Sequence, residues 1–177
     1  MMTRQRDRYN LIGIVTAVVL VLLDQWTKYL AVLHLKGQSA IVLWEGVFEL
    51  HYLENRGAAF GILQGQKGVF LVCTVLILFL IAFFYIRMPE GKRFFLMRTV
   101  AVLLAAGAVG NLIDRMRYSY VVDFLYFKLI DFPVFNVADC YVTVGAVLLA
   151  VLILFVYKEE ELGFLSLKRQ EGKKKDA

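Results

Sequence analysis

The sequence predicts an all-α membrane protein with four transmembrane helices, both termini in the cytoplasm and a small β-containing region in the extracytoplasmic loops. Three observations predict this fold class. First, 60% of the 177 residues are hydrophobic, whereas soluble domains have about 45–50%. Second, the apolar residues form long continuous runs. Third, lysines and arginines are distributed unevenly between the segments that join those runs.

Four apolar runs are long enough to cross a bilayer, because a helix needs roughly 20 mostly apolar residues to span the hydrocarbon core. The runs are continuous rather than alternating, so they indicate helices and not barrel strands. The expected spans are about 9–33, 68–87, 95–114 and 139–157. No internal repeat or linker divides the chain, so residues 1–177 are expected to form one integral membrane domain.

The first run could instead be a cleaved signal peptide, since it follows a basic start. Residues 11–23 have the apolar character of such a peptide. The segment that follows, Asp24-Gln25-Trp26-Thr27-Lys28, contains no small-x-small cleavage site. We therefore expect this span to be retained.

The basic residues predict the orientation of the spans. Thirteen lie in the N-terminal tail, the loop between the second and third spans and the tail at 158–177. Only six lie in the loops at about 34–67 and 115–138. Because basic loops stay in the cytoplasm, these two longer loops should face outward. The net charge of +5 then reports topology rather than nucleic-acid binding. The run Lys173–Lys175 could bind anionic lipid, although a solvated tail is favoured.

In this orientation, polar residues of three spans converge at one depth, while the second span is apolar. They are Asp24 and Lys28 in the first span, Asn111, Asp114 and Arg115 in the third, and Asn136 and Asp139 in the fourth. Ionisable groups at membrane depth are costly and usually functional. The pattern predicts a shared polar site near the outer interface.

Several of these groups also have a purely structural interpretation. Asp24 and Lys28 lie four residues apart on one helix face, which suits an ion pair as well as a substrate contact. The small residues at 105–110 indicate close helix packing. Cys140 adjoins Asp139 but has no histidine nearby in the sequence. The cysteines and histidines also lack the spacing of a zinc site, so no metal is expected.

The first outer loop is more than a linker. Residues 47–53 alternate loosely and are rich in aromatics, which predicts a short strand lying on the membrane surface. Glycines at 57, 61, 65 and 68 should then interrupt regular structure. Such a loop could form a lid or cradle over the polar site.

Asp123 and Asp139 are the strongest catalytic candidates. They lie 16 residues apart at the edge of an apolar stretch. Two carboxylates in such a place predict a pair that performs acid–base chemistry at a membrane surface.

The motifs together resemble those of the bacterial lipoprotein signal peptidase (signal peptidase II) family, over about residues 10–157. They are Asp24-x-x-x-Lys28, Asn55-Arg56-Gly57-Ala58-Ala59-Phe60-Gly61, Gly110-Asn111-Leu112-Ile113-Asp114-Arg115, Val121-Val122-Asp123-Phe124 and Phe135-Asn136-Val137-Ala138-Asp139. All five stand in the family's order. Arg56 and Cys140 depart from the family pattern without touching the two aspartates.

The resemblance implies an aspartyl endopeptidase of the bacterial cytoplasmic (inner) membrane with its site near the outer leaflet. It would remove signal peptides from diacylglyceryl-modified prolipoproteins, on the N-terminal side of the lipidated cysteine. The resemblance makes Asp123 and Asp139 the catalytic pair and implies no cofactor. Membrane lipids and cyclic peptide inhibitors of the globomycin type are the other expected ligands. The implied supporting residues are Asp24, Lys28, Asn55, Gly57, Asn111, Asp114, Arg115, Asn136 and Ala138.

Two carboxylates held within about 3 Å cannot both ionise, so the pair should share a proton near neutral pH. Two rival functions remain open on the residues alone. A small transporter or proton-conducting subunit would need Asp24, Lys28 and Asp114 along a continuous path, but the second span offers no ionisable residue. A non-catalytic assembly factor would leave Asp123 and Asp139 without a role.

Overall fold

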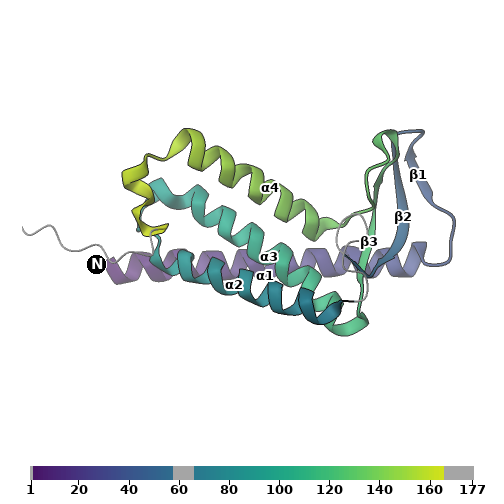
Figure 1. The fold of residues 1–177 in the computed structure, drawn as a ribbon, viewed down its shortest axis with the longest axis horizontal. Coiled ribbons are helices and arrows are strands. Elements are labelled where there is room, and N and C mark those ends of the chain that lie inside the picture. Colours follow the sequence, from purple (N-terminus) through teal and green to yellow (C-terminus); the bar gives the residue numbers. More distant parts are fainter. Residues whose placement is uncertain (1, 58–65, 166–177) are drawn as a thin grey trace, which may run out of the picture.

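The computed structural model of the chain describes residues 2–57 and 66–165. Within these residues, four long helices form a bundle that carries a three-stranded sheet at one end (Figure 1). The helices are α1 (Met2–Leu35), α2 (Lys67–Arg87), α3 (Phe95–Tyr118) and α4 (Val137–Val151). A π-helical turn at Leu152–Val156 continues α4, and short 3-10 helices lie at Lys92–Phe94, Lys128–Ile130 and Glu159–Leu165.

In the described part of the chain, four helical stretches are long and apolar enough to cross a membrane, which confirms the predicted four-helix membrane protein. The cytoplasmic position of both termini stays a prediction. The bounds differ from the expected spans at the polar ends. The helix α3 continues past residue 114 because Asp114 is buried and paired inside the bundle, so its charge does not end the helix. The helix α4 begins already at Val137 because the side chain of Asn136 caps its first turn.

The helix α3 is the centre of the bundle, since it packs against α1, α2 and α4. Its small residues allow this close approach. A β-carbon added to Gly107 would lie 2.5 Å from the carbonyl oxygen of Ala138 on α4. The prediction that residues 105–110 serve close helix packing is therefore confirmed.

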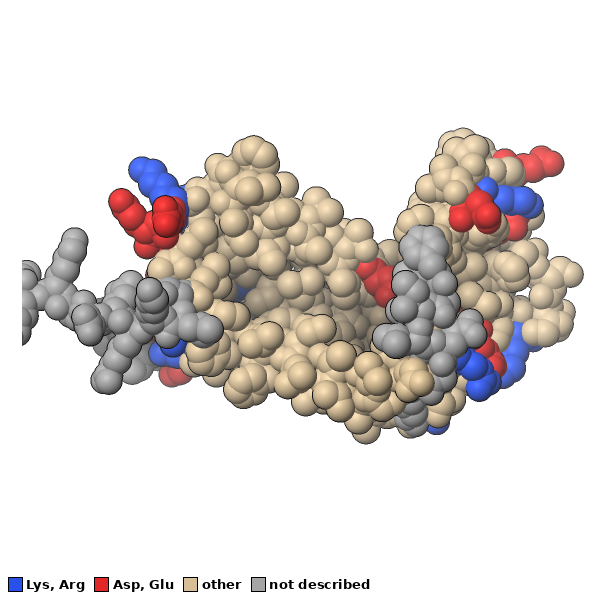
Figure 2. Space-filling view, viewed as in Figure 1, with Lys and Arg blue, Asp and Glu red and all other residues tan. Residues whose placement is uncertain are grey.

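The outer faces of the helices are apolar. On α2, for example, Leu76 and Phe79 have 57% and 67% of their surface exposed. Exposed apolar surface of this extent is rare on soluble monomers and matches the hydrocarbon core of a bilayer. The space-filling view shows the same uncharged surface along the bundle, with charged side chains gathered at its two ends (Figure 2).

The sheet contains β1 (Ile41–Trp44), β2 (Phe48–Asn55) and β3 (Val121–Phe127), which are antiparallel in the order β1-β2-β3. The strand expected at residues 47–53 is confirmed as β2. Its two partner strands were not predicted. The sheet packs against the end of α1, where Leu35 contacts a cluster that includes Val122 and Phe124.

The predicted breaks in the first outer loop are only partly tested. Gly57 follows the end of β2, as expected. Gly68 does not interrupt regular structure, because it lies in the first turn of α2, where a glycine weakens a helix less than in the helix interior. Gly61 and Gly65 lie outside the described residues. The motif residues 58–61 and the lysine-rich segment 166–177 also lie outside them.

The first described turn of α1 and the 3-10 helix after α4 lie at one end of the bundle, opposite the sheet (Figure 1). The α2–α3 connection lies at that same end. The sheet and the α2–α3 connection should therefore face opposite sides of the membrane, and the distribution of basic residues predicts that the sheet faces outward.

This orientation predicts the result of cysteine labelling. In a chain whose Cys73 and Cys140 are replaced by serine, Ser39→Cys next to β1 should react with a membrane-impermeant thiol reagent in intact cells. Lys92→Cys, which is also exposed but lies in the α2–α3 connection, should react only after the membrane is opened. The opposite labelling pattern would reverse the orientation.

Candidate active site

Asp123 lies in β3 with only 1% of its surface exposed. Two asparagine amides hold its carboxylate. Asn136 donates a 2.6 Å hydrogen bond from Nδ2 to Oδ1, and Asn55 donates a 2.8 Å bond to Oδ2. Asn55 reaches this position because β2 pairs with β3 and places Asn55 opposite Val121.

Asp139 lies in the first turn of α4, where it forms a capping box with Asn136. The Asn136 amide N–H donates to Asp139 Oδ2 at 3.1 Å, and the Asp139 amide N–H donates to Asn136 Oδ1 at 3.0 Å. Asn111 donates from Nδ2 to the other carboxylate oxygen, Oδ1, at 2.8 Å. Asn136, which is fully buried, therefore binds both aspartates, one through its side chain and one through its backbone.

Asn111 connects this pair to a buried lysine. Its Oδ1 accepts a 2.9 Å hydrogen bond from Lys28 Nζ and a 3.1 Å bond from Asn136 Nδ2. Lys28 is 3% exposed, and its Nζ also lies 3.0 Å from Asp24 and 3.1 Å from Asp114. All three N–H groups of the ammonium are thus used.

The two acids beside Lys28 fasten other elements to the site. Asp24 Oδ1 accepts a 2.9 Å hydrogen bond from the amide N–H of Ala138, which ties α1 to α4. Asp114 Oδ2 accepts a 3.1 Å bond from the amide N–H of Val122, which ties α3 to β3. Gly110 makes room for this arrangement, because a β-carbon there would lie 2.5 Å from Asp24 Oδ2.

Gln25 belongs to this network and was missed by the sequence analysis. Its Nε2 lies 2.9 Å from Asp114 Oδ1, 3.2 Å from Asp24 Oδ2 and 3.2 Å from the carbonyl oxygen of Gly110. The available signal was its place beside Asp24 in an otherwise apolar helix. A neutral amide at membrane depth also requires partners, because unsatisfied polar groups there are costly.

Arg115 faces the site and is more than an interfacial anchor. Its guanidinium donates a 3.3 Å hydrogen bond to the carbonyl oxygen of Gly57 and stacks 4.5 Å from the ring centre of Phe70. The Gly57 amide N–H in turn donates to Asn55 Oδ1 at 3.0 Å. Arg115 therefore holds the corner of the chain that presents Asn55 to Asp123.

The structure thus brings all the sequence-predicted site residues into one hydrogen-bonded network where the helices meet the sheet. The network has an excess of acid: four carboxylates lie near the cations of Lys28 and Arg115. Burial, together with the negative charge of Asp139, raises the pKa of Asp123 from 3.8 to about 7. An acid–base pair with one titrating proton near neutral pH is the chemistry this arrangement offers.

Among the described residues, Asp139 is the one carboxylate of the network that reaches the surface. Of the four carboxylates, Asp24, Asp114 and Asp123 are fully buried, whereas Asp139 is half-buried. The space-filling view shows acidic atoms at the surface of a hollow between the helices, at the end near the sheet (Figure 2). In the described residues, no three His, Cys, Asp or Glu side chains form a group that could hold a metal ion.

A family model and the similar proteins found by sequence comparison all point to one family. Residues 16–155 match a family model described as signal peptidase (SPase) II. The chain is 44% identical over 146 residues to the lipoprotein signal peptidase of Streptococcus thermophilus, covering 82% of this chain and 92% of that protein. It is 42% identical over 151 residues to the lipoprotein signal peptidase of Halothermothrix orenii, covering 84% and 97%.

Two solved structures are also similar. Both are described as bacterial membrane enzymes determined by the in meso method. The structure at 2.3 Å resolution has a TM-score of 0.71 at 31% identity and covers 89% of this chain and 93% of its own. The structure at 1.9 Å has a TM-score of 0.69 at 32% identity, with coverage of 82% and 94%.

The network predicts that Lys28 is a main source of stability. Lys28→Met would leave Asp24 and Asp114 buried without their cation, and breaking a buried ion pair in this way costs about 3–5 kcal/mol. The matched control is Lys36→Met, which removes an exposed ion pair with Glu54 and should change stability little. Melting curves in detergent measure both. Equal, small shifts for the two variants would contradict the role given to Lys28.

Proposed function

The chain belongs to the signal peptidase II family, and from that premise we propose that Asp123 and Asp139 cleave the substrate peptide as an aspartyl pair. The observation that carries the proposal is the position of Asn136, which binds both carboxylates. Asp123 on β3 and Asp139 on α4 are 16 positions apart in the sequence, and Asn136 joins them in one site.

The proton of the pair is proposed to rest on Asp123 before the reaction. Burial of this carboxyl and the charge of Asp139 support that assignment, since both raise the pKa of Asp123. Asp139 lies at the N-terminus of α4, where the helix dipole favours a negative charge. Its half-buried carboxylate is therefore the base that meets water.

In the proposed reaction, Asp139 removes a proton from water while the water oxygen attacks the carbonyl carbon of the scissile peptide bond. Asp123 gives its proton to the carbonyl oxygen. When the tetrahedral intermediate collapses, the C–N bond breaks, the proton on Asp139 passes to the leaving nitrogen and the hydroxyl proton returns to Asp123. Each carboxyl group then has its starting protonation state.

We propose a diacylglyceryl-modified prolipoprotein as the substrate, cut on the N-terminal side of the lipidated cysteine. The place of the site supports this, because it lies where the apolar helices end and the sheet begins (Figure 1). A substrate with a membrane-embedded signal helix and two acyl chains would place its cleavage site at this boundary, at the surface of the membrane. The enzyme is expected in the bacterial inner membrane with the site at the outer leaflet, and cyclic peptides of the globomycin type are expected to bind at the same site.

The transporter alternative is set aside, since the matched relatives are peptidases. The buried charges that suggested it have another role in the network. Lys28 binds Asp24, Asp114 and Asn111 together in one cluster, which supports an architectural function for these groups.

Replacing either catalytic carboxylate should remove cleavage while leaving the fold. We predict that Asp123→Asn and Asp139→Asn each lower single-turnover cleavage at saturating substrate by at least ~10²-fold, since acid–base catalysis is lost. The fold should survive because Asn nearly matches Asp in shape, but the melting temperature should fall, since the new NH2 group meets an N–H donor whose hydrogen bond the carboxylate oxygen had accepted. Near-normal turnover in either variant would exclude that residue from the chemistry.

Asp114→Asn is the matched control, because Asp114 is also a buried acid of the network but contacts Lys28, Gln25 and Val122 rather than the proposed pair. We expect a lower melting temperature with measurable turnover. Complete loss of the chemical step with an unchanged melting curve would show that the catalytic pair has been wrongly chosen.

The pKa of Asp123 also predicts the pH dependence. Because the pKa is raised to about 7, the carboxyl keeps its proton below that pH and loses it above. The value of kcat/KM should therefore fall as the pH rises from about 7 to about 9, since the general acid is ionised. A flat profile over this range would contradict the assignment of the proton to Asp123.

A further inference from the structure

Gln25 lies among the buried acids of the network but has no part in the proposed reaction. Its Nε2 donates to Asp114 Oδ1 at 2.9 Å, and it lies 3.2 Å from both Asp24 Oδ2 and the carbonyl oxygen of Gly110. In the described part of the chain, the bond from Gln25 is the one that Asp114 Oδ1 accepts, because the other donors to this carboxylate bind Oδ2. Without Gln25, a buried carboxylate oxygen would lose its donor, which costs free energy.

The two acids that Gln25 binds each hold the chain directly before one aspartate of the proposed pair. Asp114 Oδ2 accepts a 3.1 Å hydrogen bond from the amide N–H of Val122, the residue before the first aspartate. Asp24 Oδ1 accepts a 2.9 Å bond from the amide N–H of Ala138, the residue before the second. The distance between Asp24 and Asp114 therefore affects the distance between the two aspartates of the pair.

Among the described residues, Lys28 and Gln25 are the two side chains that bind both acids. Lys28 Nζ lies 3.0 Å from Asp24 and 3.1 Å from Asp114. Its charge attracts both carboxylates, but an ammonium is a compact charge on a flexible stem and does not fix their directions. The planar amide of Gln25 has two hydrogens in fixed directions. Gln25 therefore bridges two like charges that repel each other and restricts where each can lie.

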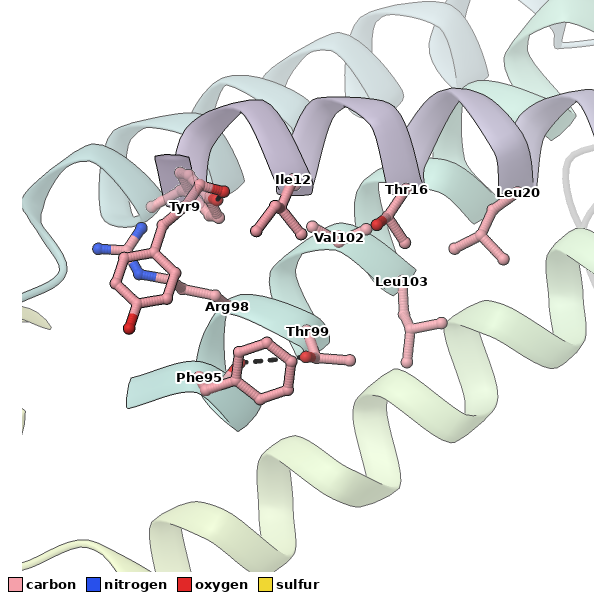
Figure 3. A pocket seen from close by; sticks show the side chains of 11 residues that line it. Tyr9, Ile12, Thr16, Leu20, Phe95, Arg98, Thr99, Val102 and Leu103 are labelled. Carbon is pink, nitrogen blue, oxygen red and sulfur yellow. Dashed lines mark hydrogen bonds between the residues drawn. The ribbon is translucent and has the colours of Figure 1, made fainter. Parts of the chain in front are cut away.

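Helix packing alone does not hold α1 at a fixed distance from α3. A cavity of about 230 Å³ lies between these helices, away from the catalytic pair (Figure 3). Its lining is mainly apolar and includes Leu103 on α3 and Leu20 on α1, one helical turn before Asp24. A close-packed interface resists movement, whereas a void lacks the atomic contacts that would do so. The polar contacts of Gln25 and Lys28 therefore set the spacing of α1 and α3 at the depth of the acids.

We propose that Gln25 is a positioning residue of the reaction, which sets the separation of Asp123 and Asp139 by binding Asp24 and Asp114 together. Its hydrogen bonds reach neither aspartate of the pair, so it acts through the two buried acids. This inference rests on the proposed aspartyl pair.

Gln25→Met tests the proposal, because it keeps the length of the side chain, removes both donors and suits membrane depth. We expect the single-turnover rate constant at saturating substrate to fall about 10- to 100-fold, since a displacement of about 1 Å can cost this much. KM should stay the same. The rate constant does not depend on the fraction of enzyme that is folded, which the amplitude reports. Gln38→Met, at an exposed glutamine after α1, is the matched control and should cleave like the unchanged enzyme.

The infrared carboxyl band of the pair gives a second readout, which a loss of folded enzyme would not move. Burial and the negative charge of Asp139 raise the pKa of Asp123 to about 7. A wider separation in Gln25→Met weakens the effect of Asp139, so the band should disappear at a lower pH than in the unchanged enzyme. Lys28 and Arg115, the cations near this carboxyl, are the same in both proteins.

A second variant, Gln25→Asn, keeps an amide but is one methylene shorter. It cannot bind both acids and should lose rate like Gln25→Met. A rate constant and a titration midpoint that are unchanged in both variants would overturn the inference. A lower amplitude at an unchanged rate constant would also overturn it, by showing a role in folding alone. Normal cleavage by Asp123→Asn would instead contradict the aspartyl pair, so the two failures are distinguishable.

Discussion

The buried ammonium of Lys28 is the interaction on which the rest of the structure depends. It lies between Asp24 on its own helix and Asp114 on α3, and it also binds Asn111. The two acids then hold the backbone of α4 and β3 through the amides of Ala138 and Val122. A cation at membrane depth is costly unless it is fully paired. The charge pairs and hydrogen bonds around Lys28 therefore fix α1, α3, α4 and β3 relative to one another. Apolar helix faces alone would let the helices slide past one another.

Amide side chains connect Lys28 to the proposed catalytic pair, Asp123 and Asp139. Asn111 accepts from Lys28 and donates to Asp139, while Asn136 donates to Asp123 and caps the helix that carries Asp139. Amides donate and accept hydrogen bonds without titrating near neutral pH. The groups that donate hydrogen bonds to the two carboxylates are therefore uncharged, which supports the proposal that the exchangeable proton stays on the aspartates themselves. Arg115 also helps to position the asparagines: its guanidinium donates a hydrogen bond to the Gly57 carbonyl oxygen, and the Gly57 amide N–H donates to Asn55 Oδ1.

Much of this could be predicted from the sequence because it depends on local composition. Continuous apolar runs gave the four membrane helices, and the common depth of their polar residues indicated one site. The strand β3 could not be predicted in the same way, since a strand exists only through pairing with distant residues. Its register with β2 also decides that Asn55 meets Asp123. Gln25 was missed for another reason: it carries no charge, and only its contacts with Asp24 and Asp114 give it a role.

We propose that the two aspartates hold one proton between them at neutral pH, surrounded by the amides of asparagines. Infrared difference spectroscopy of the protein during a pH titration tests it most directly, because a protonated carboxyl group has its own stretching band. We expect a carboxyl band that disappears as the pH rises through about 7 and is missing from Asp123→Asn. A band of the same size in that variant, or no carboxyl band titrating near neutral pH in the unchanged enzyme, would contradict it.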